Sequence, residues 1–339
     1  MKRDRRIALV SNASISSPDE GIRKLGFELS RRLPDDNLIV EIAQDAPALT
    51  RKLMLGRSLK DKLRGSEPSA VIYLPTQSAS LGSHIRSAIL RWVSGAPVLM
   101  IATQPGHGFI AERAIARAIG PKLIATPSPP LLQRLGPRRA RFVAMGVDLE
   151  TFRPPTAQER EQARDALAVG DKPVVLHVGH LTRARNFDAL ISLHNRMDVS
   201  TLVVTDPHRS SNEILESLRR AGISVVNHFL PEIRLAYWAA DCYVFQVENE
   251  NGAIGVPLSV LEAMATDLPV VTTPFGGLPK MFKPTVGFRF ASNDDERVSQ
   301  AQNVLNLPRD EVGTRQMVMG FSWDHVTREL VQAVTSLCG

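Results

Sequence analysis

Two segments in the second half of the chain carry the residues whose types and spacing could do chemistry. The first, GHLTRARNFDAL at 179–190, starts at the end of a predicted strand and runs into a predicted helix. Its His180, Arg183 and Arg185 could bind an anion together with helix N-terminal amides, and a diphosphate would suit such a site. Taken alone, the segment more often indicates an ordinary loop whose arginines face solvent.

The second segment, ENENGAIGVPLSVLEAMATDLPVVTTPFGGLP at 248–279, leads from a loop into a helix that carries Glu262. A carboxylate in the first turns of such a helix can accept hydrogen bonds from the vicinal hydroxyls of a ribose, while loop amides bind phosphate oxygens. A glutamate there can also simply stabilise the helix dipole, by about 0.3–1 kcal/mol. The two segments together favour a nucleotide site more than either does alone.

Alternating apolar runs and amphipathic stretches must position these segments. In the first half, strands are predicted at 7–11, 38–43, 70–75, 97–103 and 122–128, and helices at 22–33, 83–93 and 112–119. This alternation predicts a parallel sheet with helices on both faces.

The second half repeats the alternation after a Pro-rich segment at 143–159. An apolar strand at 173–179 follows, and further apolar or amphipathic segments lie at 187–197, 200–206, 212–222, 223–228, 233–246, 258–267 and 268–274. We therefore expect one domain over 1–150, a second over 151–320, and a last helix over 321–339 that packs back toward the first domain.

Composition excludes several classes of protein. The chain has 339 residues, of which 43% are hydrophobic and 22% charged, so it is neither disordered nor fibrous. Cys242 and Cys338 lack metal-site or disulfide-framework spacing, and no apolar run has the length of a membrane helix or a signal peptide. These features predict a cytoplasmic enzyme.

The charge balance of 41 Lys and Arg against 35 Asp and Glu suits nucleic acid, anionic lipid or phosphorylated ligands. Nucleic acid is the least favoured, since aromatic residues make up only 5% of the chain. The basic stretch at 50–65 predicts an amphipathic helix, which either packs its leucines into the core or docks on an anionic membrane. Its basic residues are Arg51, Lys52, Arg57, Lys60, Lys62 and Arg64, and its leucines are Leu53, Leu55, Leu59 and Leu63.

Together with GVDLETFRP at 146–154 and FSW at 321–323, these segments resemble the GT-B retaining glycosyltransferases of glycosyltransferase group 1, a family 4-like group. The resemblance is strong across about 142–323 and weaker before it. It implies an α/β GT-B fold with two Rossmann-like domains facing an interdomain cleft, the first binding the acceptor and the second the nucleotide sugar. The implied reaction moves a sugar from a nucleotide diphosphate sugar to a glycan, glycolipid or small-molecule acceptor, with retention of configuration and without a metal or other cofactor.

The resemblance also implies roles for individual residues. Arg185 would neutralise the departing diphosphate, His180 stands where many members have an arginine, and His107 would touch the donor sugar. The implied donor-binding residues are Gly21, Arg185, Leu230, Gly255, Leu258, Ser259, Glu262, Gly276 and Gly277, and the candidate acceptor contacts are Asp19 and Glu20.

One departure from the family pattern matters. The first glutamate of the paired-glutamate motif, eight positions before Glu262, is replaced by Ile254, and Glu250 is a candidate substitute. Lys280 also stands where relatives often have an acid. Two alternatives therefore stay open: a catalytically impaired GT-B nucleotide-binding or partner protein, and, less favoured, a nucleotide-sugar epimerase. An oxidoreductase and a serine hydrolase are disfavoured because the chain has neither GxGxxG after its first strand nor GxSxG.

Overall fold

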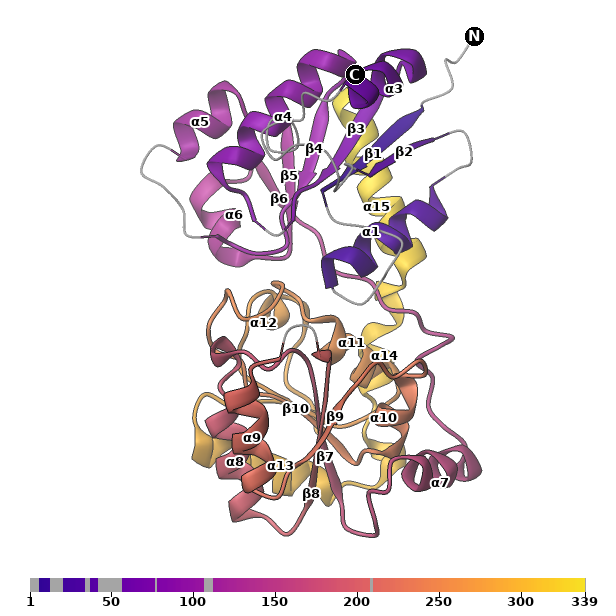
Figure 1. The fold of residues 1–339 in the computed structure, drawn as a ribbon, viewed down its shortest axis with the longest axis vertical. Helices are drawn as coiled ribbons and strands as arrows, with labels where there is room; N and C mark the ends of the chain where they lie inside the picture. The colour runs from indigo at the N-terminus through magenta and orange to yellow at the C-terminus, as the bar shows by residue number, and fades with distance from the viewer. Residues whose placement is uncertain are drawn as a thin grey trace. The chain divides into compact units, whose positions relative to one another are not determined.

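Two six-stranded sheets organise the chain. The structure is a computed structural model that describes residues 6–12, 21–33, 37–41, 57–76, 78–106, 112–207 and 210–338 (Figure 1). Contacts divide the chain into two units, the first comprising Met1–Met145, Ile254–Val256 and Trp323–Gly339, the second Gly146–Ala253 and Pro257–Ser322. Each unit contains one of the sheets, and all the described strand pairs are parallel. The predicted α/β fold with two parallel sheets is confirmed.

The first sheet has the strand order β2-β1-β3-β4-β5-β6. Its strands, from β1 to β6, are Ile7–Ser11, Leu38–Glu41, Ala70–Leu74, Val98–Ile101, Leu123–Thr126 and Ala140–Phe142. All five residues of β1 and of β3 are buried. Continuous apolar runs of this kind fit strands that are covered on both faces by helices.

Helices cover both faces of the first sheet (Figure 1). One layer consists of α3 (Arg57–Ser66), α4 (Leu81–Ser94), α5 (Glu112–Ala118) and α6 (Pro129–Leu135), which share one hydrophobic core with the strands. On the other side lie α1 (Gly21–Arg32) and α15 (Trp323–Thr335), which contact each other. There the Nε atom of Arg32 lies 2.7 Å from Oδ1 of Asp324. The C-terminal helix therefore belongs to the first unit.

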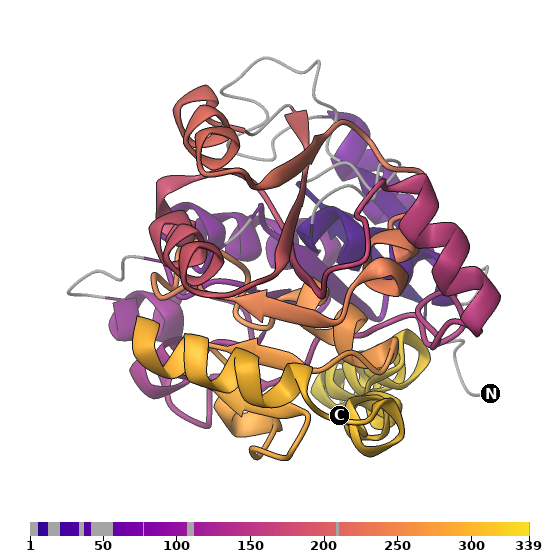
Figure 2. The same ribbon diagram turned by 90° about the horizontal axis from the view of Figure 1, so that it is seen from below.

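The second sheet has the order β12-β11-β10-β7-β8-β9. From β7 to β12 its strands are Val174–Val178, Ser200–Thr205, Ser224–Asn227, Cys242–Phe245, Val270–Thr272 and Phe288–Phe290. A hydrophobic core joins the sheet to three helices, α8 (Phe187–Arg196), α9 (Asn212–Arg220) and α13 (Asp294–Leu305). Apart from this core, α7 (Ala157–Ala166) packs on α10 (Arg234–Ala239), and α11 (Leu258–Ala265) packs on α14 (Thr314–Val318), so helices surround the sheet (Figure 2).

Local signals explain where several helices begin. Thr156 and Glu159 form a capping box at the start of α7, in which each side chain accepts a hydrogen bond from the other residue's backbone N–H. Asn293 caps α13 by accepting from the amide of Glu296 at 2.9 Å. Nothing in the apolar pattern predicts α13, β6 or β12. The two strands are three residues each with an arginine in the middle, so neither is a continuous apolar run, whereas the cap of α13 was a usable signal.

A cluster of arginines around Asp241 holds α7 against the start of β10. The Asp241 carboxylate pairs with Arg160 at 2.6 Å, Arg164 at 3.3 Å and Arg309 at 3.2 Å. It also accepts from the amide of Val174 at 2.9 Å. Burial lowers the pKa of Arg160 to about 10, which shows how far this guanidinium is removed from water. The cluster therefore connects α7 to the start of β7 and to the start of β10.

The basic stretch at 50–65 is described from Arg57 onward, as α3. Leu59 and Leu63 are buried in the core of the first unit, whereas Lys62 and Arg64 are exposed. In the described part, the leucines therefore pack inward and the charges face water. None of the helices within the described ranges is long and apolar enough to cross a bilayer.

Candidate functional site

The candidate site lies at the carboxyl ends of β7 and β10, the two central strands of the second sheet. They pair directly, yet the chain continues from β7 to β8 on one side and from β10 to β11 on the other. Loops that leave such a switch point diverge and create the place where open α/β sheets bind ligands. The two loops meet here, because Gln246 Nε2 donates to the carbonyl oxygen of Arg185 at 3.1 Å.

Arg185 ends a single 3₁₀ turn, η1 (Arg183–Arg185), which follows β7. Its guanidinium lies against Gly179, where a Cβ atom would come within 2.7 Å of Cζ, so a side chain at position 179 would displace it. Arg185 is half-buried, and its buried Nε atom has no hydrogen-bond partner. Within the described ranges the guanidinium forms no ion pair, and burial lowers the pKa of Arg185. A partly desolvated cation without a counterion is well suited to an anionic ligand.

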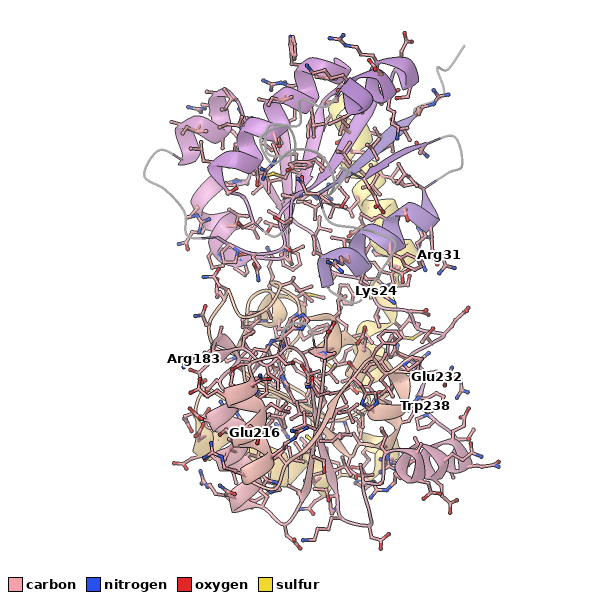
Figure 3. All side chains as sticks on the ribbon, in the orientation of Figure 1. Lys24, Arg31, Arg183, Glu216, Glu232 and Trp238 are labelled. Carbon is pink, nitrogen blue, oxygen red and sulfur yellow. The ribbon has the colours of Figure 1, made fainter. Side chains whose placement is uncertain are left out.

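Several other arginines of the second unit have carboxylate partners, whereas Arg289 shares with Arg185 a buried Nε atom that has no hydrogen-bond partner. The buried Arg297 pairs with Asp294 and lies 3.6 Å from Glu248. Arg183, which the sequence places with Arg185 around an anion, instead pairs with Glu213 at 2.8 Å. Figure 3 shows the Arg183 side chain at the outer surface of the second unit, and it is 83% exposed. The structure therefore separates the two arginines that the sequence groups together.

Glu262 and Ser259 lie one turn apart on α11, and each bonds to a buried tyrosine. The hydroxyl of Tyr237 donates to Oε2 of Glu262 at 2.7 Å, and the hydroxyl of Tyr243 donates to Oγ of Ser259 at 2.7 Å. Burial raises the pKa of both tyrosines, and the Glu262 charge raises that of Tyr237 further. Both hydroxyls therefore stay protonated and remain donors at neutral pH.

A neutral histidine lies beside this group. His177 on β7 is fully buried, with its ring 6.3 Å from that of Tyr243 and edge-on to Phe187 at 5.4 Å. Its Nδ1 lies 3.0 Å from the carbonyl oxygen of Val244, and since a carbonyl only accepts, Nδ1 carries the proton. Burial, with a smaller contribution from the Arg185 charge, lowers the pKa of His177 to about 3. The positive charge at this end of β7 therefore comes from Arg185 and not from His177.

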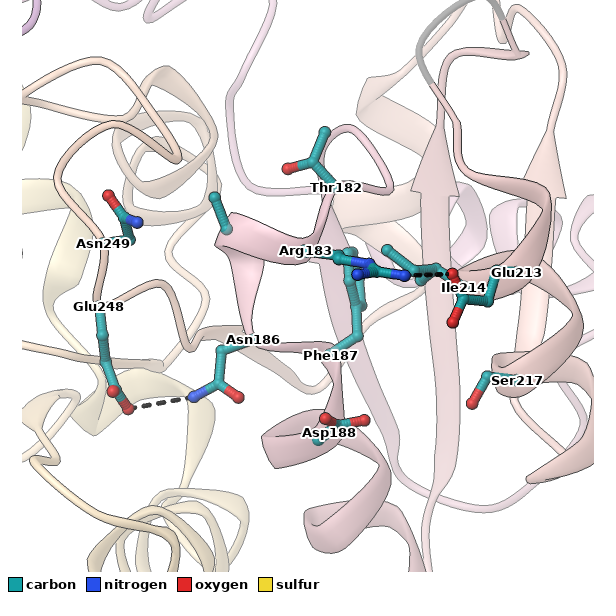
Figure 4. Close-up of a pocket in the computed structure, with 11 residues that line it drawn as sticks. Thr182, Arg183, Asn186, Phe187, Asp188, Glu213, Ile214, Ser217, Glu248 and Asn249 are labelled. Carbon is teal, nitrogen blue, oxygen red and sulfur yellow. Dashed lines mark hydrogen bonds and ion pairs between the residues drawn. The ribbon is translucent and has the colours of Figure 1, made fainter.

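A separate pocket of about 500 Å³ lies between η1, the start of α8, α9 and the loop after β10 (Figure 4). Its lining includes three carboxylates, Asp188, Glu213 and Glu248, and one guanidinium, that of Arg183. Glu248 accepts from the side-chain amide of Asn186 at 3.1 Å. The lining thus carries an excess of negative charge, and Arg185 does not belong to it. This pocket is a poor match for a diphosphate.

The remaining predicted residues fall in several places. His180 and Leu258 are half-buried near the loops that follow the two central strands, and Leu230 follows β9. Gly276 and Gly277 form the turn before α12 (Leu278–Met281), where Gly276 has φ of 51°, which favours glycine. His107, Asp19 and Glu20 lie outside the described residues.

Gly21 and Gly255 belong to the first unit. A Cβ atom at Gly21 would lie 2.9 Å from Cδ1 of Ile254, so the isoleucine that replaces the family glutamate packs against this glycine. The amide of Gly255 donates to the carbonyl oxygen of Thr103 at 2.6 Å. Both glycines therefore contact residues of their own unit.

Sequence reasoning missed Tyr237, Tyr243 and His177. All three lie in apolar runs, at 233–246 and 173–179, which predict only helix or strand. No spacing signal connects Tyr237 with Glu262, because the contact depends on how α10 packs beside α11. Within the described ranges, no group of three or more His, Cys, Asp or Glu side chains could hold a metal ion.

Two doubly wound parallel sheets in one chain define the GT-B class of fold, and solved structures agree. A glycosyltransferase from Rickettsia africae ESF-5 superimposes with a TM-score of 0.77 at 14% identity, covering 98% of this chain and 99% of that one. The Anabaena protein Alr3699/HepE in complex with UDP gives a TM-score of 0.72 at 15% identity, covering 98% and 100%. At these identities the likeness concerns the fold alone.

Sequence comparison gives a family match for part of the second unit. Residues 172–308 match the family model described as Glycosyl transferases group 1. A D-inositol 3-phosphate glycosyltransferase from Corynebacterium urealyticum is 29% identical over 233 residues, covering 59% of this chain and 51% of the relative. The chain spans about half the length of the curated relatives that it matches, between 42% and 51% for three of them. Residues 172–308 of the second unit are therefore similar to a glycosyl transferases group 1 domain, in a chain with the GT-B fold.

The buried histidine leads to a pH prediction. Between pH 6.5 and about 3, unfolded His177 binds a proton that the folded protein does not bind, so stability is full above pH 6.5 and falls as the pH decreases. The expected loss is about 1.4 kcal/mol per pH unit. We expect His177→Phe to reduce this slope in thermal unfolding measured from pH 7.5 to 4.

The slope should not vanish in this variant, because burial also lowers the pKa of His84 in the first unit to about 4. The control His228→Phe, at an exposed histidine of the second unit, should keep the slope of the parent protein. Equal slopes for His177→Phe and the parent would contradict the neutral, buried state of His177.

Proposed function

We propose that the protein is a retaining glycosyltransferase that moves a sugar from a nucleotide diphosphate sugar to a glycan, glycolipid or small-molecule acceptor. The observation that carries this proposal is Arg185, a half-buried guanidinium without an ion pair among the described residues, at the switch point of a group 1 domain. A diphosphate would supply the missing negative charge. The name of one relative, a D-inositol 3-phosphate glycosyltransferase, is consistent with a small phosphorylated acceptor.

The donor would bind along the second unit. Arg185 and nearby amides contact the diphosphate, with His180 as a further donor of hydrogen bonds, and Gly276 and Gly277 allow close approach of their backbone. Glu262 accepts from the ribose hydroxyls, since a carboxylate offers about four acceptor positions. Leu258, Ser259 and Leu230 complete the donor contacts in this proposal.

The reaction we propose is a front-face substitution. The acceptor hydroxyl oxygen forms the new bond to the anomeric carbon, while the bond from that carbon to the donor phosphate oxygen breaks on the same face. The proton of the hydroxyl passes to the departing phosphate oxygen. Arg185 stabilises the charge that develops there, the part of the chemistry in which fixed donors are usually most effective. In this proposal the guanidinium takes the place that a metal ion has in other transferases.

Nucleotide binding tests the donor site. We expect UDP, GDP or ADP to raise the melting temperature of the parent, because a ligand that binds only the folded state stabilises it. Arg185→Gln and Glu262→Ala should reduce this shift strongly. The matched controls are Arg183→Gln, whose guanidinium pairs with Glu213, and Glu161→Ala, an exposed glutamate on α7. Equal loss in Arg183→Gln and Arg185→Gln would argue against a specific diphosphate contact.

The anomeric configuration of the product tests whether the reaction proceeds with retention. With the donor sugar that binds and a simple acceptor alcohol, the product should have the anomeric configuration of the donor, measured from the proton coupling constant at the anomeric carbon. An inverted product would exclude front-face substitution.

A second candidate function follows from Ile254. An isoleucine cannot accept hydrogen bonds from a donor sugar, and here it packs on Gly21. The protein would then bind a nucleotide or a partner without transferring sugar. Binding of UDP-sugar or GDP-sugar without hydrolysis or transfer would favour this candidate, whereas slow donor hydrolysis in the absence of acceptor would favour the transferase.

We also propose that the first unit meets the inner face of an anionic membrane in the cytoplasm. Lys60, Lys62 and Arg64 lie on the outside of α3, which packs against α4, and Trp92 of α4 is 70% exposed. The Nζ atom of Lys60 lies 6.0 Å from the centre of the Trp92 ring. Leu81, 45% exposed, lies about three turns earlier on the same face of α4. Basic side chains around an exposed tryptophan are typical of an interfacial contact.

Vesicle binding checks this surface. We expect the protein to sediment with vesicles of phosphatidylglycerol and phosphatidylcholine, and not with phosphatidylcholine alone. Lys62→Glu with Arg64→Glu should weaken binding by more than about tenfold, since each basic residue near such a surface contributes about 1 kcal/mol. Trp92→Ala should weaken it too, whereas Phe229→Ala, which removes a 74% exposed aromatic residue of the second unit, should not. No binding by the parent would end this proposal.

A further inference from the structure

The hydroxyl of Tyr237 occupies a fixed position beside Glu262. Tyr237 is fully buried on α10, and its hydroxyl lies 2.7 Å from Oε2 of Glu262. Its ring packs edge-on against Phe152, with 5.6 Å between centroids and 87° between planes, and lies 6.0 Å from the ring of Tyr243. Aromatic neighbours on two sides leave the ring little freedom to rotate.

The helix that carries Tyr237 is itself fixed. Arg160 of α7 donates to the carbonyl oxygens of Trp238 at 2.8 Å and Ala240 at 2.7 Å. The indole nitrogen of Trp238, labelled in Figure 3, donates to the carbonyl oxygen of Arg153 at 2.8 Å. A hydrogen bond from so constrained a donor limits where its acceptor can lie. The carboxylate of Glu262, by contrast, is on a side chain with three rotatable bonds.

We propose that Tyr237 is a positioning residue that orients the Glu262 carboxylate for the ribose hydroxyls of the donor. This inference rests on the proposed role of Glu262. The bond from Tyr237 uses one acceptor position of Oε2 and sets the plane of the carboxylate, and a carboxylate has further positions that can accept from a diol. Without Tyr237, the carboxylate would have to be ordered when the ligand binds, at the cost of affinity.

The chemistry of the pair supports a function in ligand binding more than in folding. The carboxylate of Glu262 is a charged acceptor, so the bond is charge-assisted and about twice as strong as a neutral one. Tyr243 makes the neutral counterpart, to the hydroxyl of Ser259, one turn earlier on the same helix. The neutral pair shows that α11 can be linked to a buried tyrosine without a charged side chain, so a link alone does not require the carboxylate of Glu262.

A thermodynamic cycle with deoxynucleotides tests the inference. Isothermal titration would measure the dissociation constants of UDP and 2′-deoxy-UDP, or of GDP and 2′-deoxy-GDP if the nucleotide panel selects guanine. The proteins are the parent, Tyr237→Phe, Glu262→Ala and the double variant. We expect Tyr237→Phe to weaken binding of the ribonucleotide about 3- to 10-fold, because the Glu262 side chain must then be ordered when the ligand binds. Binding of the deoxynucleotide should change less than twofold.

Further results separate positioning from a general structural effect. Tyr237→Phe should add no loss in the Glu262→Ala background, and it should raise the KM of the donor sugar nucleotide with little change in kcat. The control Tyr73→Phe removes another fully buried tyrosine hydroxyl, which accepts from Arg86 at 2.7 Å in the first unit, and it should leave nucleotide affinity unchanged.

Four outcomes would overturn the inference. Equal weakening of ribonucleotide and deoxynucleotide by Tyr237→Phe would assign the residue a structural role only. Additive losses in the double variant would show that Tyr237 acts independently of Glu262. Suppose that the parent binds the ribonucleotide more tightly than the deoxynucleotide, with the difference lost in Glu262→Ala. If Tyr237→Phe leaves that difference unchanged, only the inference fails. If no nucleotide binds to the parent, the proposed function fails as well.

Discussion

The pairing of β7 with β10 is the constraint on which the second unit depends. The strand order makes the chain leave β7 toward β8 and β10 toward β11, in opposite directions. Beyond the strand ends, the loop with Arg185 and the segment that starts at Gln246 are joined by the hydrogen bond from Gln246 to the carbonyl oxygen of Arg185. Because Gly179 has no side chain, the guanidinium of Arg185 can lie directly against the backbone at this point.

Near this point, three buried aromatic side chains, those of His177, Tyr237 and Tyr243, carry the polar groups. His177 is kept neutral by burial, and Tyr237 and Tyr243 are kept protonated for the same reason. These groups supply directed hydrogen bonds without adding charge. Arg185 and Glu262 are the charged residues of this group, and we propose that they bind the diphosphate and the ribose diol of a nucleotide.

Much of the fold could be predicted from the sequence. Continuous apolar runs identified strands such as 70–75 and 173–179, because a strand buried on both faces needs such a run. The three-residue strands β6 and β12 could not be predicted, since an arginine interrupts each of them and neither is a continuous apolar run. The polar helix α13 was also missed, although Asn293 and the acidic first turn were a usable start signal. The long segment at 233–246 proved to contain a helix and a strand, α10 and β10.

The sequence by itself determined the α/β alternation, the parallel sheets, the family resemblance and the presence of Arg185 and Glu262 in its motifs. Only the tertiary structure decided which charges are paired: Arg183 meets Glu213 at the surface, while Arg185, two residues away, meets no carboxylate among the described residues. It also decided that Tyr237 bonds to Glu262. The physical reason is that periodicity and motif spacing act along the chain, whereas ion pairing and burial depend on distances between elements far apart in sequence.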